Sequence, residues 1–449
     1  MEPVKNKTEI IESFGEVDKI NKQADEARKD NAALSLSLSK EAISLARLSG
    51  YSQGLAKAYL NAGISCRMSS NFEAAIEYYE ESLKLYKQLN DKKGQTRVLN
   101  SIGNVHLNLS NFDKALEYYD ECIFVLQSIG DLTFETTVLT NRGLSYQQYG
   151  DLKAALNNYL ESLSISRSEG TEIHYALYNN LGIVYLEIGN YNESLLYFTE
   201  ALKRTQALEM VVDQGFALAN LGRTFLYMED FTNAVTYLSE ALIILKKIGS
   251  RQAETQVYAN LGKAFRRMRN FPEAVKLYNR ALKYYREIGD KSSVAHTLSE
   301  LGELHFELND YSSSKQYFQE GLELAREIND VVDEVRINTG LARLYSKFQD
   351  TTRSETYLFS AESLAKSRDS YKELSIIYKL FSENCSILGK AKESKNFLNK
   401  YFENLTKLNN LAEENKVQSI MLGHIHGENL YTHQAVTSEI PNDAALSFA

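Results

Sequence analysis

The residue types that most often carry out chemistry in proteins are present here, but their spacing does not assemble a catalytic or metal site. Seven histidines and three cysteines are spread over 449 residues. The cysteines show no C-x-x-C zinc pattern, and a spacing of two places His424 and His426 on different sides of a helix. The sequence contains no nucleophile elbow, zinc-protease motif or phosphate-binding loop. We therefore predict no catalytic residue, no metal ligand and no cofactor, and we interpret His106 and His305 as packed core side chains.

Asparagine side chains recur at one position of a repeated pattern, and the chemistry they offer is binding. Two residues before a recurring glycine, the sequence carries Asn61, Asn141, Asn180, Asn220 and Asn260. A side-chain amide both donates and accepts hydrogen bonds, so such a row can pair with the backbone of an extended peptide of any sequence. The alternative is that each amide bonds a neighbouring part of the protein's own fold.

Basic residues follow two of these asparagines at helical spacing. Residues three, four and seven positions later share the face of the asparagine, which selects Arg223, Lys263 and Arg267 and, less squarely, Arg266. A guanidinium can bind a carboxylate through two parallel hydrogen bonds. We predict that this stretch receives an acidic or C-terminal segment of a partner, with ordinary solvated charge as the alternative.

A repeat of forty residues sets these positions. Its glycine recurs at Gly63, Gly103, Gly143, Gly182, Gly222, Gly262 and Gly302. In a typical copy a large residue follows the glycine at position three, a small one at twelve and a bulky one at sixteen, as in Phe265, Ala274 and Tyr278. An asparagine or aspartate at position eight suits a helix N-cap. Each copy therefore predicts two antiparallel helices in closest contact at the glycine.

This pattern resembles the tetratricopeptide repeat (TPR). The period and the Asn-Leu-Gly triplets at 180–182, 220–222 and 260–262 are similar to a long-helix variant found in Pins-type adaptors, kinesin light chains and bacterial signalling proteins. The resemblance implies an all-α, right-handed superhelical solenoid of antiparallel helix pairs whose first helices line a concave groove. The chain departs from the family by lacking tryptophan and the proline that often ends a repeat, and neither departure threatens the fold.

Four segments follow from the repeat register. We expect an N-terminal arm over 1–17, a TPR array of about nine to ten helix-pair units over 18–409, a helix over 410–434 and a mobile tail over 435–449. The 410–434 helix either caps the last apolar face or is a connector, since it is similar to the segment that follows such arrays in bacterial proteins with cyclase or kinase output domains.

Composition narrows the class of partner. A net charge of -9 argues against a general nucleic-acid binder. The sequence has neither a signal-peptide stretch nor an apolar run of membrane-spanning length. We expect a cytoplasmic protein without a membrane partner, with its cysteines buried and reduced.

The leading prediction is a non-enzymatic scaffold that binds a protein or peptide segment in the concave groove. The alternative is a regulatory or sensor module that acts on a separate bacterial signalling protein. A helical phosphatase-type regulator is less favoured, because the short polar start of the chain offers no room for the dedicated N-terminal bundle of that type. The sequence leaves open whether copies pair into a homo-oligomer through the ends of the array.

Overall fold

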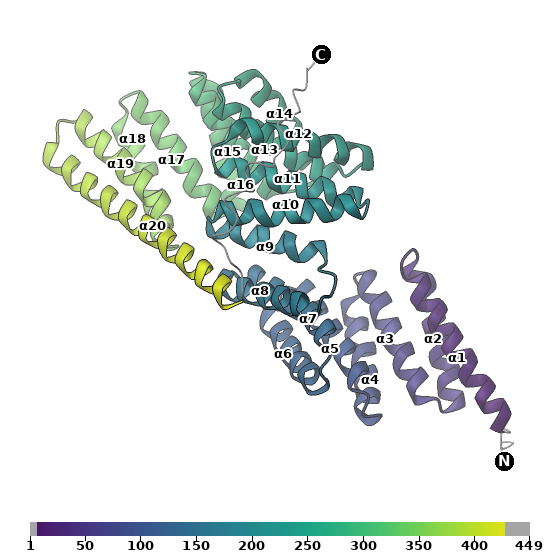
Figure 1. Cartoon of the computed structure of the whole chain (residues 1–449). Coiled ribbons are helices and arrows are strands. Elements are labelled where there is room, and N and C mark those ends of the chain that lie inside the picture. The colour runs from purple at the N-terminus through teal and green to yellow at the C-terminus, as the bar shows by residue number, and fades with distance from the viewer. Residues whose placement is uncertain (1–6, 427–449) are drawn as a thin grey trace. The chain divides into compact units, whose positions relative to one another are not determined.

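The computed structural model describes residues 7–426, which form twenty helices joined by short turns (Figure 1). In chain order these are α1 (Lys7–Ala27), α2 (Ala32–Ser49), α3 (Ser52–Met68), α4 (Phe72–Gln88), α5 (Lys92–Asn108), α6 (Phe112–Ile129), α7 (Leu132–Tyr149), α8 (Leu152–Ser168), α9 (Tyr175–Ile188), α10 (Tyr191–Ala207), α11 (Val211–Tyr227), α12 (Phe231–Ile248), α13 (Arg251–Arg267), α14 (Phe271–Ile288), α15 (Lys291–Glu307), α16 (Tyr311–Glu327), α17 (Val331–Lys347), α18 (Thr351–Lys366), α19 (Tyr371–Ile387) and α20 (Ala391–Ile425).

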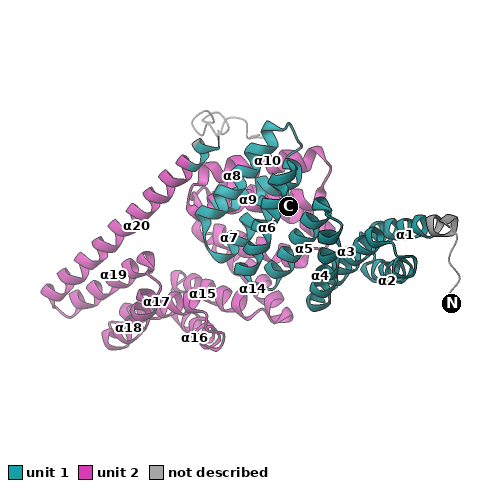
Figure 2. Cartoon of the chain, turned by 90° about the horizontal axis from the view of Figure 1, so that it is seen from below, with its two compact units in different colours: residues 1–184, 422–429 teal, residues 185–421, 430–449 magenta. Residues whose placement is uncertain are grey.

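The helices divide into two compact units (Figure 2). Unit 1 holds the chain up to Val184 together with the segment that starts at Leu422, and unit 2 holds Tyr185–Met421. Within each unit consecutive helices pack as antiparallel pairs, and the first helix of one pair also contacts the first helix of the next, as α15 contacts α17 and α17 contacts α19. This is the helix-pair solenoid that the repeat predicts.

The recurring glycines lie where the two helices of a pair come closest. A Cβ atom on Gly63 would stand 2.5 Å from the ring of Tyr79, and one on Gly302 would stand 2.6 Å from the ring of Phe318. Both rings are fully buried. A methyl group at either position would therefore force the helices apart, which explains why the helix interior accepts the cost of a glycine of about 0.5–1 kcal/mol.

The residue eight positions after each glycine caps the second helix of the pair, as predicted. Five of these side chains accept a hydrogen bond from a backbone amide in the first turn, namely Asn71, Asp151, Asp230, Asp310 and Asp350. The caps of α6, α10 and α14 (Asn111, Asn190 and Asn270) make no such bond. The same register therefore starts the helices whether or not the side chain closes the cap.

The two ends of the array differ from the expected boundaries. Helix α1 begins at Lys7, so most of the expected arm over 1–17 is helical. Helix α20 runs without a break from Ala391 to Ile425, so the last helix of the array and the expected helix over 410–434 are continuous through Ile425. Its first turns pack on α19, where the rings of Phe381 and Phe397 stack with centroids 4.8 Å apart. The expected tail over 435–449 lies outside the described residues.

Candidate functional site

Helix α11 presents one exposed stripe that combines apolar and polar side chains. Val212, Phe216, Asn220, Arg223 and Tyr227 follow each other at spacings of three or four and share a face. Phe216 is 42% and Tyr227 50% exposed, which is unusual for aromatic side chains of a first helix in this array. Asn220 and Arg223 lie between them and are half-buried. The stripe therefore offers two aromatic surfaces on either side of an amide and a cation.

Arg223 makes no ion pair among the described residues, although Glu187 is near enough to influence its pKa. Its Nε atom is covered and has no hydrogen-bond partner, and the described residues place no carboxylate within ion-pair distance of the guanidinium. Burial lowers the pKa of Arg223, while Tyr227 and Glu187 act in the opposite direction. Arginine stays ionised in proteins, so a positive charge is held here in a partly desolvated place.

Helix α13, which contacts α11, continues this arrangement. Lys263 stands forty residues after Arg223, and its Nζ lies 5.3 Å from the centre of the Tyr227 ring without an ion-pair partner among the described residues. Asn260 is half-exposed, and its amide makes no hydrogen bond within residues 7–426. A cation beside an aromatic ring and an amide without a hydrogen bond among the described residues thus lie on α13.

Arg267 differs from its two neighbours because it has an anionic partner. A terminal nitrogen of Arg267 lies 2.6 Å from Glu229, and its guanidinium lies 5.5 Å from the ring of Phe231. Both partners of this ion pair are well exposed, so the pair contributes about 1 kcal/mol or less. We call Phe216, Asn220, Arg223, Tyr227, Asn260, Lys263 and Arg267 the α11–α13 stripe.

Two other cations, Arg266 on α13 and Arg343 on α17, are neutralised by carboxylates of the protein itself. Arg266 pairs with Glu300 at 3.4 Å and with Glu307 at 3.3 Å, and the side chains of Arg266 and Glu300 are 12% and 13% exposed. Burial would raise the pKa of Glu300, but Arg266 and other nearby cations lower it. On α17, Arg343 pairs with Glu303. The positive charges of Arg266 and Arg343 are therefore neutralised by glutamates of the array and are not available to a ligand.

In unit 1 the predicted asparagines join the repeats to each other. The Asn61 side chain is 4% exposed and donates a hydrogen bond of 3.1 Å to the carbonyl of Asn21. The amide of Asn141 donates to the side chain of Asn100 at 3.0 Å. The structure thus places these two residues in contacts between copies, and we exclude them from the candidate site because their donors are already used.

Asn180 lies on α9 and is half-buried. Its position in the register matches Asn220 and Asn260, but it belongs to unit 1 and they belong to unit 2. We therefore build the candidate site from the unit 2 residues alone.

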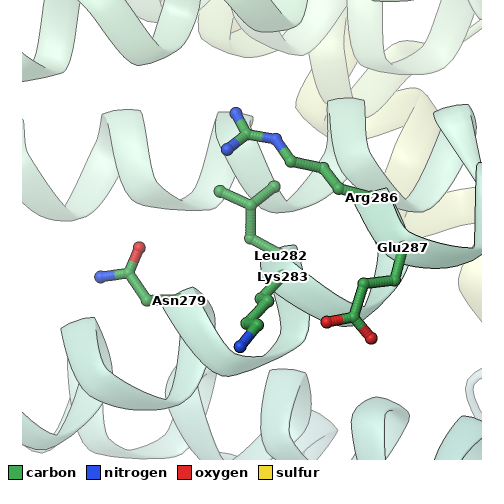
Figure 3. A pocket seen from close by; sticks show the side chains of 5 residues that line it. All are labelled: Asn279, Leu282, Lys283, Arg286 and Glu287. Carbon is green, nitrogen blue, oxygen red and sulfur yellow. The ribbon is translucent and has the colours of Figure 1, made fainter.

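A surface hollow on α14 is a weaker alternative (Figure 3). It has a volume of roughly 460 Å³ and is lined by Asn279, Leu282, Lys283, Arg286 and Glu287. Arg286 pairs with Glu320, and Glu287 accepts from Arg251 at 3.1 Å. Because these charges are already matched, the hollow offers a ligand little beyond Lys283.

The cysteines and His106 behave as core residues, whereas His305, also predicted to be in the core, is half-buried and its Nδ1 lies 3.1 Å from Asp310. His106 is buried and stacks on Tyr118 with ring centres 5.5 Å apart. All three cysteines are buried, and burial raises the pKa of the Cys122 thiol to about 12. Among the described residues no group of histidine, cysteine or carboxylate side chains is arranged to hold a metal ion. Of the helices in that same part of the chain, none is both long and apolar enough to cross a bilayer.

Two members of the site were missed by the sequence reasoning, Phe216 and Tyr227. Both carry a signal in the register, since they stand six residues before and five residues after Gly222. Those two positions are exposed in other copies too, as at His296 and Glu307. Comparing which copies place an aromatic residue there would have identified them.

Family models match most of the array. A model described as the MalT-like TPR region matches residues 209–379. Two models of the tetratricopeptide repeat match residues 24–88 and 95–168, and residues 176–209. No curated protein matches this chain.

Solved structures with the same fold share little sequence with the chain. The apo form of the quorum sensor NprR from B. thuringiensis is 16% identical over 78% of this chain and 98% of its own, with a TM-score of 0.60. The signal transduction ATPase PH0952 from Pyrococcus horikoshii, which has a tetratricopeptide repeat sensor, is 15% identical over 80% of this chain and 53% of its own, with a TM-score of 0.57. A Rap protein complexed with Competence and Sporulation Factor is 14% identical over 79% of this chain and 99% of its own, with a TM-score of 0.53.

The glycine register, the helix pairs and the three family models agree. The chain is a tetratricopeptide-repeat protein.

Proposed function

We propose that this protein is a binding scaffold that holds an acidic segment or the C-terminal carboxylate of a protein or peptide on the α11–α13 stripe of unit 2, and that it works by binding rather than by catalysis. The carrying observation is that Arg223 and Lys263 have no carboxylate partner within residues 7–426, while Arg266 and Arg343 have one. A ligand carboxylate would supply the missing charge.

The neighbouring side chains suit a peptide. Asn260 can pair with its backbone, and Phe216 and Tyr227 offer apolar surface to its side chains. Hydrogen bonds to a charged group contribute about 1.5–3 kcal/mol, against about 1 kcal/mol for neutral ones. We therefore expect the two cations to provide most of the affinity and the Asn260 amide to help position the backbone.

Proteins of similar fold are described as recognition proteins. NprR is called a quorum sensor, PH0952 carries a tetratricopeptide repeat sensor, and the Rap protein was solved with Competence and Sporulation Factor bound. Such arrays present extended surfaces to their partners. This likeness supports the proposal that the array binds a segment of a partner. The chemical nature of that segment is inferred from the residues of the α11–α13 stripe alone.

The proposal is tested with the full-length protein as bait for a peptide array. Each peptide is presented with a free C-terminal carboxylate, with a C-terminal amide, and with its acidic residues replaced by amides. We compare the wild-type protein with Arg223→Gln/Lys263→Gln and with the matched control Lys283→Gln, which removes a lysine from the surface of α14.

We expect the double variant to bind the best peptides at least about tenfold more weakly, and the control to bind as the wild type does. Loss of the peptide carboxylates should have the same effect as loss of the two cations. Equal binding by all three proteins would exclude the α11–α13 stripe as the binding site.

A second candidate function is a sensor that passes the binding event to a separate signalling protein. It is favoured by the description of two proteins of similar fold as sensors. The test is to purify the protein from its own cells with and without the best peptide and to identify the proteins that remain bound. A signalling protein whose recovery changes with the peptide supports the sensor function, and recovery that the peptide does not change argues against it.

A further inference from the structure

Helix α20 is anchored near its start and near its end but not between. Its first part packs on α19 through Phe397, and farther along Lys407 lies 5.4 Å from the ring of Tyr371. From Asn409 to Gln418 every residue is exposed except Asn415, which is half-exposed. These ten residues span roughly 15 Å of helix that no other element within residues 7–426 covers.

The helix meets unit 2 again at Ser419. This side chain is 1% exposed, and the amide of Asn190 donates to its hydroxyl at 3.4 Å. Asn190 is the N-cap of α10, ten helices earlier in the array. In a repeat solenoid each copy normally contacts only its immediate neighbours, so a contact between the last helix and α10 is a special feature of this chain.

The socket for Ser419 is specific to this copy. Asn111 and Asn270 occupy the same register as Asn190 and are exposed, whereas Asn190 is 8% exposed. None of the three closes its own helix cap. The side-chain amide of Asn190 instead donates a hydrogen bond to Ser419 of α20.

The docked end is held by Ser419, by the half-buried Ile420 and Leu422 and the buried Gly423, and by His426, whose Nε2 lies 3.0 Å from Oδ1 of Asn157. Ser419 faces the socket, while Val417 and Met421 point outward and are 55% and 59% exposed. An isolated helical stretch of about ten residues is marginal in water, so the uncovered residues 409–418 depend on both anchors for their order.

We propose that the distal part of α20 is a detachable strap: docked at Asn190, it holds the copies between α10 and α19 at one curvature, and released, it lets that curvature change. The α11–α13 stripe lies among these copies. The strap is an inference about the fold and does not depend on what the stripe binds.

The test compares two full-length variants that add the same charge to α20. Ser419→Lys places a cation in the buried socket, where an unpaired charge is costly, and Val417→Lys places it on the exposed face two residues away. Both changes introduce a better helix former, so neither weakens the helix by itself. A glutamate-specific protease reports on the strap, because Glu413 and Glu414 lie in the uncovered stretch and neither variant adds a glutamate.

We expect Ser419→Lys to raise the rate of cleavage after Glu413 and Glu414 at least about tenfold, since cleavage follows the population of the open form. Asn190→Ala should raise it about fivefold, through the loss of one hydrogen bond. Val417→Lys and Asn270→Ala should match the wild type. Equal rates for Ser419→Lys and the wild type, or an equal increase in Val417→Lys, would overturn the strap.

A distance measurement tests the effect on curvature. Ile243 in α12 and Phe359 in α18 are 62% and 57% exposed, and the three native cysteines are buried, so cysteines at these two positions can be spin-labelled selectively. We expect the distance distribution to broaden or shift in Ser419→Lys and to stay unchanged in Val417→Lys. An unchanged distribution in Ser419→Lys would show that the strap does not set the curvature.

Discussion

The two units use the same repeat register for different purposes. In unit 1, Asn61 and Asn141 are bonded to residues of the neighbouring copy. In unit 2, Asn260 makes no hydrogen bond within the described residues, and the neighbouring Arg223 and Lys263 have no carboxylate partner. The same register position thus carries asparagines that bond adjacent copies in unit 1 and an asparagine, Asn260, that makes no hydrogen bond among the described residues of unit 2.

The difference between the cations arises from the residue at the equivalent position of the adjacent copy, about forty residues away in the sequence. Arg343 finds Glu303 forty residues earlier, and Arg266 finds Glu307 forty-one residues later. The residue forty positions after Arg223 is Lys263, which carries the same charge and cannot pair with it. In a repeat protein, a polar side chain is available for a ligand when the equivalent residue of the next copy cannot satisfy it.

The largest expected effect comes from breaking a satisfied pair in unit 2. Replacing Glu300 by alanine leaves the nearly buried Arg266 with only Glu307 and should lower the free energy of local opening of α13–α16 by about 3 kcal/mol. Hydrogen exchange of these helices, followed by mass spectrometry, measures the change.

The control for this experiment removes both charges. Because apolar residues of similar volume can replace a buried ion pair at little cost, Arg266→Met/Glu300→Leu should recover most of the lost protection. Equal destabilisation in the single and the double variant would show that the charge left behind by Glu300→Ala is not the cause.

The second effect concerns the unit 1 asparagines. Asn61→Ala removes a buried hydrogen bond between α3 and α1, which should lower the opening free energy of α1–α4 by about 1–2 kcal/mol. Ser101, at the same register in the next copy, bonds only to Arg97 of its own helix and is the control. If Ser101→Ala costs as much as Asn61→Ala, the bond between copies has no special role.

The third effect is a pH dependence that arises from Glu300. Its pKa is lowered in the folded protein by Arg266 and other cations, against the effect of burial. A lowered pKa contributes stability above the unfolded value of about 4.3, and that contribution is lost as the pH falls through the folded value. Near neutral pH the contribution is fully present and does not change with pH, since the carboxylate is ionised there in both states.

The urea midpoints of the wild type and Glu300→Gln, followed by circular dichroism, measure this dependence. The midpoint of the wild type should exceed that of the variant near pH 6, and the difference should shrink as the pH falls below 4. A difference that grows with acid would mean that Glu300 is not stabilised as the carboxylate.

The sequence predicted the fold because a few steric positions repeat through the array, with glycine at most copies and a small residue, Ala342 or Ser382, at the last ones. Gly63 and Tyr79, or Gly302 and Phe318, meet at a distance that no larger residue allows, so the register was readable from residue size alone. The N-caps followed from the same register, as at Asp151 and Asp310.

The candidate site was only partly predictable. Arg223, Lys263 and Asn260 lie on the expected helix faces, but the sequence could not separate Asn260 from Asn61, because the difference depends on whether the backbone of a neighbouring copy offers an acceptor. The contact between Ser419 of α20 and Asn190 could not be predicted from the sequence either, since the two residues are 229 positions apart and the repeat pattern does not relate them.

The smallest expected effect on stability is the one that most sharpens the comparison between the units. Asn260→Ala should change the opening free energy of α11–α14 by less than about 0.5 kcal/mol, because the half-exposed amide has no partner to lose among the described residues. On the proposed function, the same change should weaken binding of the best peptide by about 1 kcal/mol, or roughly fivefold. Hydrogen exchange and peptide binding measured on one preparation separate the two effects, and the expected result is the reverse of that for Asn61→Ala, which should lose stability and keep its affinity. A loss of stability in Asn260→Ala equal to that in Asn61→Ala would mean that both asparagines join copies and that the amides of unit 2 are not reserved for a ligand.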